Sequence, residues 1–187
     1  MTTLAPNLAI TTAVRCLRAG GVIGYPTEAV FGLGCDPLQH HAVQRLLDIK
    51  QRSVDKGLLL IAASLEQLLP WINITDEQFR QLKSHWPQGV SYLLDAHANA
   101  PTWITGQHKK IGVRVTQHPV ARSLCDQFGG AIVSTSANIS GRPATRTSIQ
   151  LRRHLGDILD FIVEGECNLQ TKPSTIIDFT SGQVVRS

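Results

Sequence analysis

The stretch "HHAVQRLLDIKQRSVDKGLLLIAA", residues 40–63, joins a helix pattern to a strand pattern through a short charged connection. Apolar residues in "HHAVQRLLDIK" recur at the three-to-four-residue spacing of one helical side, which predicts a helix. The apolar run "LLLIAA" is typical of a buried strand. The cations Lys50, Arg52 and Lys56 therefore lie where a helix gives way to a core strand, which is an unusual place to gather positive charge.

Outward from this stretch, helix and strand patterns alternate along the chain. Helical spacing recurs around Leu8 to Leu17, in "DEQFRQLKSHW" after a capping box of Thr75 and Gln78, in "PVARSLCDQF", and once more before "FIVEG". Strand patterns occupy "VIGYP", "GVSYLLDA", "KKIGVRVTQH", "AIV", "FIVEG", and the pair "STIIDF" and "QVVRS". We interpret the glycine-rich segments "GLGCD" and "DQFGG" as turns.

These patterns predict one α/β (α+β) domain over residues 1–187, in which helices flank a mixed sheet. Strands that are separated by helices in most places, but joined as a hairpin near the C-terminus, require both parallel and antiparallel pairing. A chain of this length can bury roughly 70% of the surface that its unfolded form exposes. Hydrophobic residues make up 42% and charged residues 17%, a composition that argues against long disordered segments.

The net charge of +4 and the isoelectric point near 9.1 favour polyanionic partners such as nucleotides or RNA. However, the lysines and arginines are dispersed along the chain, and no aromatic RNA-recognition motif occurs. A protein that only binds RNA therefore remains an alternative rather than the first expectation.

Four cysteines, at positions 16, 35, 125 and 167, stand far apart and form no C-x-x-C pair. This spacing favours reduced thiols, and we expect no metal site built by the protein. The N-terminal stretch lacks the apolar core of a signal peptide, and no run approaches the roughly 18 apolar residues of a membrane span. We therefore expect a cytoplasmic protein without membrane contact.

The three cations of the opening stretch have only Asp48 and Asp55 near them in sequence. A solvated ion pair would contribute about 0–1 kcal/mol, so pairing alone gives little reason to gather these charges. In a cleft, a cation about 4 Å from a phosphate gains on the order of 4 kcal/mol at an effective dielectric near 20. The signatures G-x-x-x-x-G-K-[ST] and G-x-G-x-x-G are absent, so any nucleotide must be bound differently.

Other polar segments fall where predicted strands begin or end. In "STSANISG", Ser136 and Asn138 follow the buried strand "AIV", and ligands of open α/β sheets tend to sit at such strand ends. Pro26 ends the first strand and exposes Thr27 and Glu28, while Ser174 precedes a late strand in "KPSTIIDF". Each segment taken alone is also consistent with an ordinary polar turn.

Together, these segments resemble the YrdC-type threonylcarbamoyl-AMP synthases. The matching pieces are "YPTEAVFGLGCD", "KQRSVDKGLLL", "VRVTQHP", "STSANISGRPATRT" and "PSTIID", in the family's order and spread over residues 25–178. The length is similar to that of the short bacterial form. The resemblance implies an open, twisted sheet with a large, concave, positively charged cavity.

The resemblance also implies residue roles. The family's Lys-x-Arg and Ser-x-Asn signature falls on the expected catalytic residues Lys50, Arg52, Ser136 and Asn138. ATP would contact Arg52, Lys56, Asn138, Arg146 and Arg186. Threonine would contact Thr27, Arg114, Ser136 and Ser174, with Arg114 as the partner of its carboxylate.

The implied reaction converts ATP, L-threonine and bicarbonate to L-threonylcarbamoyl-adenylate and pyrophosphate. In the family, transfer proteins then pass the threonylcarbamoyl group to an adenosine beside the anticodon of tRNA, and a cationic cavity is compatible with direct contact to tRNA as well. Mg²⁺ is expected to arrive with ATP, because no acidic cluster marks a dedicated metal site.

The sequence departs from the family pattern at Ser53 and Gly57, where many relatives have proline. Carbamoyl-adenylate synthases of the hydrogenase-maturation type share this domain, but they carry zinc-binding cysteine motifs that are absent here. The fold of dihydroxybutanone-phosphate synthase would need an acidic metal-binding site, whereas the polar motifs of this chain are basic and rich in hydroxyl groups.

Overall fold

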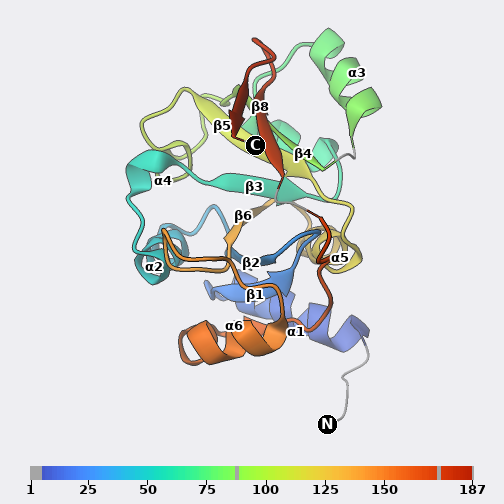
Figure 1. Cartoon of the computed structure of the whole chain (residues 1–187). Coiled ribbons are helices and arrows are strands. Elements are labelled where there is room, and N and C mark those ends of the chain that lie inside the picture. The colour runs from blue at the N-terminus through green and yellow to red at the C-terminus, as the bar shows by residue number, and fades with distance from the viewer. Residues whose placement is uncertain (1–5, 87–88, 172–173, 187) are drawn as a thin grey trace.

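The computed structural model describes residues 6–86, 89–171 and 174–186, and within these ranges nine strands form one sheet (Figure 1). Their order across the sheet is β7-β1-β2-β6-β3-β5-β4-β8-β9. The strands are β1 Ile23–Pro26, β2 Phe31–Gly34, β3 Leu59–Ala62, β4 Val90–Asp95, β5 Lys110–Val115, β6 Ile132–Ser136, β7 Phe161–Ile162, β8 Thr175–Asp178 and β9 Val184–Arg186.

The sheet is mixed, as the sequence predicts. β1 and β7, β3 and β5, and β4 and β8 pair in parallel, whereas β1 and β2, β2 and β6, β3 and β6, β4 and β5, and β8 and β9 pair antiparallel. The predicted C-terminal hairpin is confirmed, with Gly182 at a φ of 70° in its turn. The strands predicted from alternation and apolar runs all lie in this one sheet.

The α-helices are α1 Pro6–Arg18, α2 His40–Lys50, α3 Asp76–His85, α4 Thr102–Thr105, α5 Pro119–Phe128 and α6 Ser148–Leu155, with 3₁₀ turns η1 Val54–Lys56, η2 Glu66–Trp71 and η3 Gly156–Ile158. Local signals set several of their ends. The Oγ1 of Thr75 accepts from the N–H of Gln78, and the Gln78 side chain accepts from the N–H of Thr75, so the predicted capping box is confirmed. α5 ends at Gly129, whose φ of 88° favours glycine.

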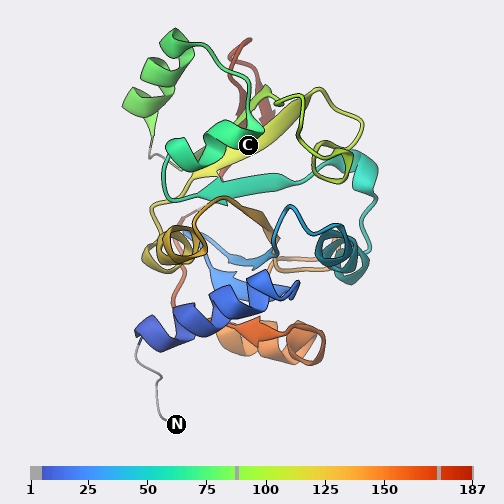
Figure 2. The same cartoon turned by 180° about the vertical axis from the view of Figure 1, so that it is seen from behind.

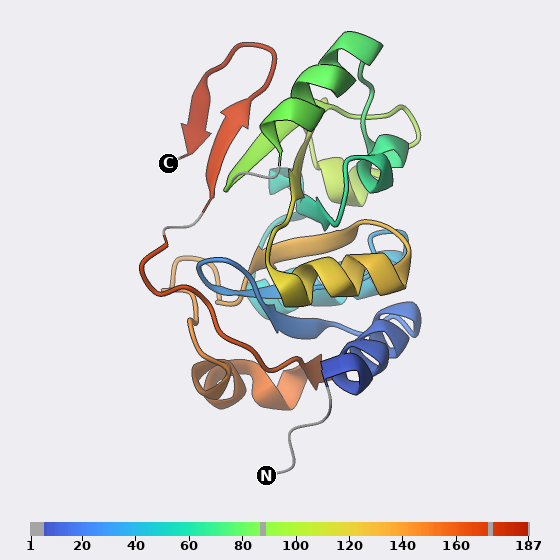
Figure 3. The same cartoon turned by 90° about the vertical axis from the view of Figure 1, so that its right-hand side faces the viewer.

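Two apolar clusters hold the helices on the sheet. α1 and α5 lie side by side, and their apolar side chains pack with residues of β1, β3 and β6 (Figures 2 and 3). The larger cluster joins α2 to apolar residues of β2, β3, β4 and β5. Cys35, Cys125 and Cys167 are buried in these clusters, and burial raises the pKa of each thiol. In the described ranges, no helix is both long and apolar enough to cross a membrane.

The prediction that "GLGCD" forms a turn is wrong, because Gly32 and Gly34 belong to β2 in the middle of the sheet. A Cβ on Gly34 would lie 2.8 Å from Tyr25 Cε1 and 2.7 Å from the carbonyl oxygen of Val133. Glycine is therefore needed so that the Tyr25 ring and β6 can approach the strand. A strand that uses glycine for close approach shows little hydrophobic alternation, which hid β2 from the sequence prediction.

The polar run after "AIV" also begins later than predicted. β6 continues to Ser136, which pairs with Gly32 of the neighbouring strand β2. Ser134, Thr135 and Ser136 are therefore strand residues, and the polar loop starts beyond them. The short helix α4 and the turn η2 were not predicted, since neither is long enough to show helical periodicity.

Candidate active site

A cavity of about 1120 Å³ opens on one face of the sheet. Its lining comes from residues of β2, β3, β4, β5, β6, β8 and β9, together with the loops that join them. Strand register explains how distant residues reach it. Ile61 of β3 pairs with Arg114 of β5, and Ile176 of β8 pairs with Arg186 of β9. Ile61 and Ile176 line the cavity. Because paired residues project from the same face of a sheet, their partners Arg114 and Arg186 reach the cavity as well.

The lining is strongly basic. It contains six lysine or arginine residues and two glutamates. Two of the cations are compensated: Lys110 Nζ lies 2.6 Å from Asp178 Oδ2, and Arg114 Nη2 lies 2.6 Å from Glu28 Oε2. In the described part of the chain, no carboxylate pairs with the other four, which are Arg52, Lys56, Lys109 and Arg186. An anionic ligand would supply the missing negative charge.

The connection between α2 and β3 places Arg52 and Lys56 on the cavity wall. After α2, Gln51 takes a left-handed conformation with φ 50°, and the N–H of Arg52 donates to the carbonyl of Leu47. Ser53 then caps the turn η1, because its Oγ accepts from the N–H of Asp55. Local hydrogen bonds therefore fix the course of this connection.

Gly57 closes the connection with φ 62°, and a Cβ there would lie 2.8 Å from the carbonyl oxygen of Thr105. Proline is restricted to φ near −65°, so a proline at position 57 would not fit this conformation. The departures at Ser53 and Gly57 are thus accommodated by a side-chain cap and by a positive φ.

Arg52 Nη2 donates to the carbonyl of Gly57 at 2.9 Å, while its buried Nε has no partner in the described structure. Burial and the charge of Arg186 lower the pKa of Arg52, and both arginines line the cavity. Two arginines that face one cavity without a carboxylate between them form a site suited to phosphate oxygens.

Lys50 lies behind the cavity wall rather than on it. It is only 2% exposed, and its Nζ donates to the carbonyl of Ser136 at 2.5 Å, to the carbonyl of Asn138 at 3.0 Å and to Asn138 Oδ1 at 3.2 Å. Burial and the nearby Arg52 lower the pKa of Lys50 to about 8. The ammonium therefore fastens the Ser136–Asn138 segment to α2.

Ser136 lines the cavity, and its Oγ donates to Asn138 Oδ1 at 2.6 Å. Asn138 itself borders a separate, smaller cavity of about 410 Å³, and its Nδ2 donates to the carbonyl of Arg142 at 2.5 Å. The amide of Asn138 thus orients Ser136 from behind. The sequence signature of Lys50, Arg52, Ser136 and Asn138 forms one cluster, of which Arg52 and Ser136 line the large cavity.

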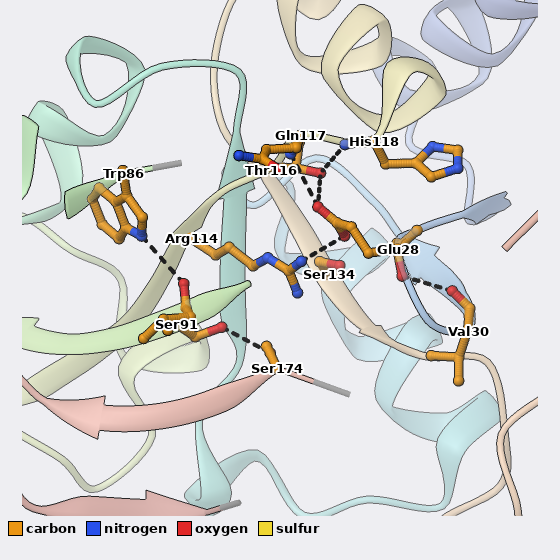
Figure 4. A network of polar contacts seen from close by, with 12 residues as sticks. Glu28, Val30, Trp86, Ser91, Arg114, Thr116, Gln117, His118, Ser134 and Ser174 are labelled. Carbon is orange, nitrogen blue, oxygen red and sulfur yellow. Dashed lines mark hydrogen bonds and ion pairs between the residues drawn. The ribbon is translucent and has the colours of Figure 1, made fainter. Parts of the chain in front are cut away.

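The predicted threonine ligands Thr27, Arg114 and Ser174 all line the cavity. Thr27 Oγ1 donates to the carbonyl of Val30 at 2.6 Å, which leaves its lone pairs available. Ser174 Oγ lies 3.0 Å from Ser91 Oγ. A dashed line marks this hydrogen bond in Figure 4. Pro173, which precedes Ser174 in the sequence motif, lies outside the described residues.

Glu28 is the central acceptor of a polar network in this wall (Figure 4). Its Oε2 pairs with Arg114, and its Oε1 accepts from Thr116 Oγ1 at 2.9 Å and from the N–H of Gln117 at 3.0 Å. Burial alone would raise the pKa of Glu28, but the Arg114 guanidinium and these hydrogen bonds hold it below its usual value. The carboxylate is therefore ionised at neutral pH.

Arg146 does not line the cavity. Its Nε donates to the carbonyl of Ala29, and its Nη2 donates to the carbonyls of Leu169 at 2.7 Å and Thr171 at 3.1 Å. The guanidinium thereby ties the loop after β1 to the segment that leads to β8. Ala29 and Thr171 line the cavity, so Arg146 supports its wall through the backbone.

Sequence reasoning assigned no role to Glu28, Thr116, Gln117 or Lys109 in the site. Glu28 carried a local signal, since it follows Pro26 at the end of a strand. The ion pair of Glu28 with Arg114 joins residues 86 positions apart, so a local sequence pattern could not predict it.

Comparison with known proteins connects this chain to a family. The Sua5/YciO/YrdC family model, which carries the description "Telomere recombination", matches residues 15–187. A curated protein of Cellvibrio japonicus named threonylcarbamoyl-AMP synthase is 48% identical over 181 residues, covering 96% of each chain.

Solved structures agree with this comparison. Sua5 of P. abyssi complexed with L-threonine superposes with a TM-score of 0.87 at 29% identity, over 96% of this chain and 53% of that one. E. coli YciO superposes with a TM-score of 0.85 at 28% identity, over 99% of this chain and 91% of that one. The mixed open sheet with flanking helices is common to these proteins.

Proposed function

The chain belongs to the Sua5/YciO/YrdC family, and on that premise we propose that it synthesises L-threonylcarbamoyl-adenylate and pyrophosphate from ATP, L-threonine and bicarbonate. It is an enzyme that acts as a nucleotidyltransferase in tRNA modification. The observation that carries this proposal is the pairing, in one cavity, of four uncompensated cations with a polar set suited to an amino acid.

The chemistry requires charge neutralisation and positioning more than a covalent nucleophile. The amine of threonine and bicarbonate give a carbamate with loss of one water molecule, and the carbamate oxygen attacks the α-phosphorus of ATP as the bond to the pyrophosphate oxygen breaks. Negative charge builds on the leaving pyrophosphate, and fixed cations stabilise it. Arg52, Lys56 and Arg186 are the cavity cations that we assign to the phosphates.

Ser136 lies between the two substrates in this proposal, where its hydroxyl contacts the nucleotide and threonine. Lys50 and Asn138 hold the Ser136 backbone and hydroxyl from behind the wall. Arg146 belongs to the nucleotide side through the loop and segment that it ties together. Lys50, Asn138 and Arg146 are positioning residues, because their described hydrogen bonds join them to other parts of the protein and none of the three lines the cavity.

Threonine is proposed to bind Thr27, Arg114 and Ser174, which share one wall. Arg114 lines the cavity and its ion pair with Glu28 uses Nη2, so its guanidinium has further N–H groups that can donate to a substrate carboxylate. The threonine complex of P. abyssi Sua5, whose fold this chain shares, supports threonine as a ligand of this fold.

We further propose that Mg²⁺ enters on the ATP phosphates and helps to neutralise them. The described residues include no group of three or more His, Cys, Asp or Glu side chains that could hold a metal ion. The cavity is also proposed to allow contact with tRNA. The adenylate then passes to threonylcarbamoyl-transfer proteins in the cytoplasm, where tRNA is modified.

Pyrophosphate release from ATP tests the proposal. Release must depend on both threonine and bicarbonate, so each is omitted in turn. The Arg52→Ala variant should lower the rate by about 100-fold or more, since a partly buried charge contact to the reacting phosphates is lost. Its far-ultraviolet circular dichroism and melting temperature should match those of the parent.

A matched control is Arg80→Ala, which removes an exposed arginine of α3 that, among the described residues, forms an ion pair with Glu77 alone. This variant should keep the parental rate. Pyrophosphate release that ignores threonine or bicarbonate would contradict the proposed function. Salt-sensitive RNA binding without turnover would instead favour a protein that only binds RNA.

A further inference from the structure

Glu28 lies beside Arg114 in the cavity wall, and the pair presents two opposite charges to the same space (Figure 4). The side chain of Glu28 is 21% exposed and that of Arg114 is 11% exposed, so both groups are partly desolvated yet reachable from the cavity. Charges in such surroundings interact more strongly with a ligand than they would in bulk water.

We infer that Glu28 selects α-amino acids by accepting the α-ammonium group of the substrate, while Arg114 holds its carboxylate. This inference rests on the proposed function and deepens it, because it states which chemical class the amino-acid site accepts. An α-amino acid carries its two charges on one carbon, so a fixed carboxylate beside a fixed guanidinium matches both. Glu28 is then a specificity residue of the synthase.

The partners of Glu28 hold its carboxylate in place at the cavity wall. An ionised carboxylate has about four lone-pair sites, and Glu28 is contacted by Arg114, Thr116, Gln117 and its own backbone N–H. A substrate ammonium group would therefore share an oxygen that already accepts another bond, and the negative charge would supply most of the attraction. Thr116 is only 1% exposed and its Oγ1 also accepts from the N–H of His118, so the support for the carboxylate is rigid.

Glu28 also discriminates between the two substrates by charge. It compensates Arg114 as Asp178 compensates Lys110, whereas Arg52, Lys56, Lys109 and Arg186 stay uncompensated. A phosphate placed on Arg114 would face the Glu28 carboxylate and be repelled, while a zwitterion would be attracted. The triphosphate is therefore directed to the uncompensated cations, and Arg114 remains free for the amino acid.

The test compares threonine with 2,3-dihydroxybutanoate, in which a hydroxyl group replaces the ammonium group. Binding of each to the parent protein is measured by calorimetry and by inhibition of threonine-dependent pyrophosphate release. A lost charge-assisted hydrogen bond should weaken binding of the analogue by about 10- to 100-fold. Because this measurement uses the parent protein, it does not depend on the folding of a variant.

The Glu28→Gln variant keeps the shape of the side chain and removes its charge. It should raise the KM for threonine by about 10-fold or more and bring threonine and its analogue within a few-fold of each other. Added pyrophosphate should inhibit this variant more strongly in competition with threonine. The matched control is Glu166→Gln, since Glu166 also lines the cavity, whereas the ion pair of Arg114 in the described structure is with Glu28. That variant should keep the parental preference.

Equal binding of threonine and the analogue to the parent protein would overturn the inference, as would a Glu28→Gln variant that still prefers threonine. These results are distinct from failure of the proposed function. In that case the parent protein itself would release no pyrophosphate in response to threonine.

Discussion

Replacing Lys50 with methionine tests whether a buried, protonated lysine fastens the Ser136–Asn138 segment. Methionine keeps an unbranched apolar stem but removes the ammonium that donates to three oxygen atoms of this segment. The measurable signature is the pH dependence of the free energy of unfolding, because burial lowers the pKa of Lys50 from 10.5 to about 8.

The sign follows from proton linkage. Between about pH 8 and 10.5 the unfolded chain holds a proton on this lysine that the folded protein has lost, so the contribution of Lys50 to stability rises with pH. Below pH 8, Lys50 is protonated in both the folded and the unfolded protein. Burial of the charged ammonium then lowers the free energy of unfolding by about 3 kcal/mol relative to a neutral lysine. Integration of the linkage relation predicts a gain of about 2 kcal/mol between roughly pH 7.5 and 9.5.

The assay is urea unfolding followed by tryptophan fluorescence, since the chain contains three tryptophans. Burial also raises the pKa values of Cys35, Cys125 and Tyr25, whose ionisation would destabilise the folded protein at high pH. The Lys50→Met variant shares those groups, so the difference between parent and variant isolates the contribution of Lys50. We expect the parent to gain about 2 kcal/mol relative to the variant over that pH range.

A difference that stays constant with pH, or that falls as pH rises, would refute the reasoning. If the variant does not fold, the parent still gives an answer through nuclear magnetic resonance of lysines labelled at Cε. One lysine should titrate near pH 8. A spectrum in which every lysine titrates near the ordinary value would contradict the buried ammonium.

Two further predictions concern the cavity wall. Arg114→Lys should raise the KM for threonine by about 10-fold while the KM for ATP is unchanged, because an ammonium cannot reproduce the planar fork that pairs with Glu28 and a substrate carboxylate; an equal rise in both KM values in steady-state assays would contradict this role. Gly57→Ala should lower the free energy of unfolding by about 1–3 kcal/mol, since its φ is 62° and a Cβ would meet the Thr105 carbonyl oxygen at 2.8 Å. Gly130→Ala is the control in chemical denaturation, because nothing lies within 4 Å of its added Cβ, and equal stability of the two variants would count against the strained turn.

The sequence by itself determined the elements whose signals are local. Helical spacing marks α2, α3 and α5, and a capping box for α3 and a terminal glycine for α5 mark helix ends, because hydrogen bonds within a helix join residues only four positions apart. The alternation of apolar residues in β5 placed Arg114 opposite the core, and its side chain does face the cavity. The five motifs also identified the family, which the comparisons show.

Only the tertiary structure decided what each polar residue contacts. Lys50 and Arg52 are two positions apart in one motif, yet Lys50 is buried against a segment 86 residues away while Arg52 faces the cavity. Glu28 meets Arg114, and Arg146 meets the carbonyls of the segment before β8, because pairing of nine strands brings their ends together. Contacts of this kind depend on strand register and on packing between residues that are distant in sequence. Neither can be predicted from a local sequence pattern.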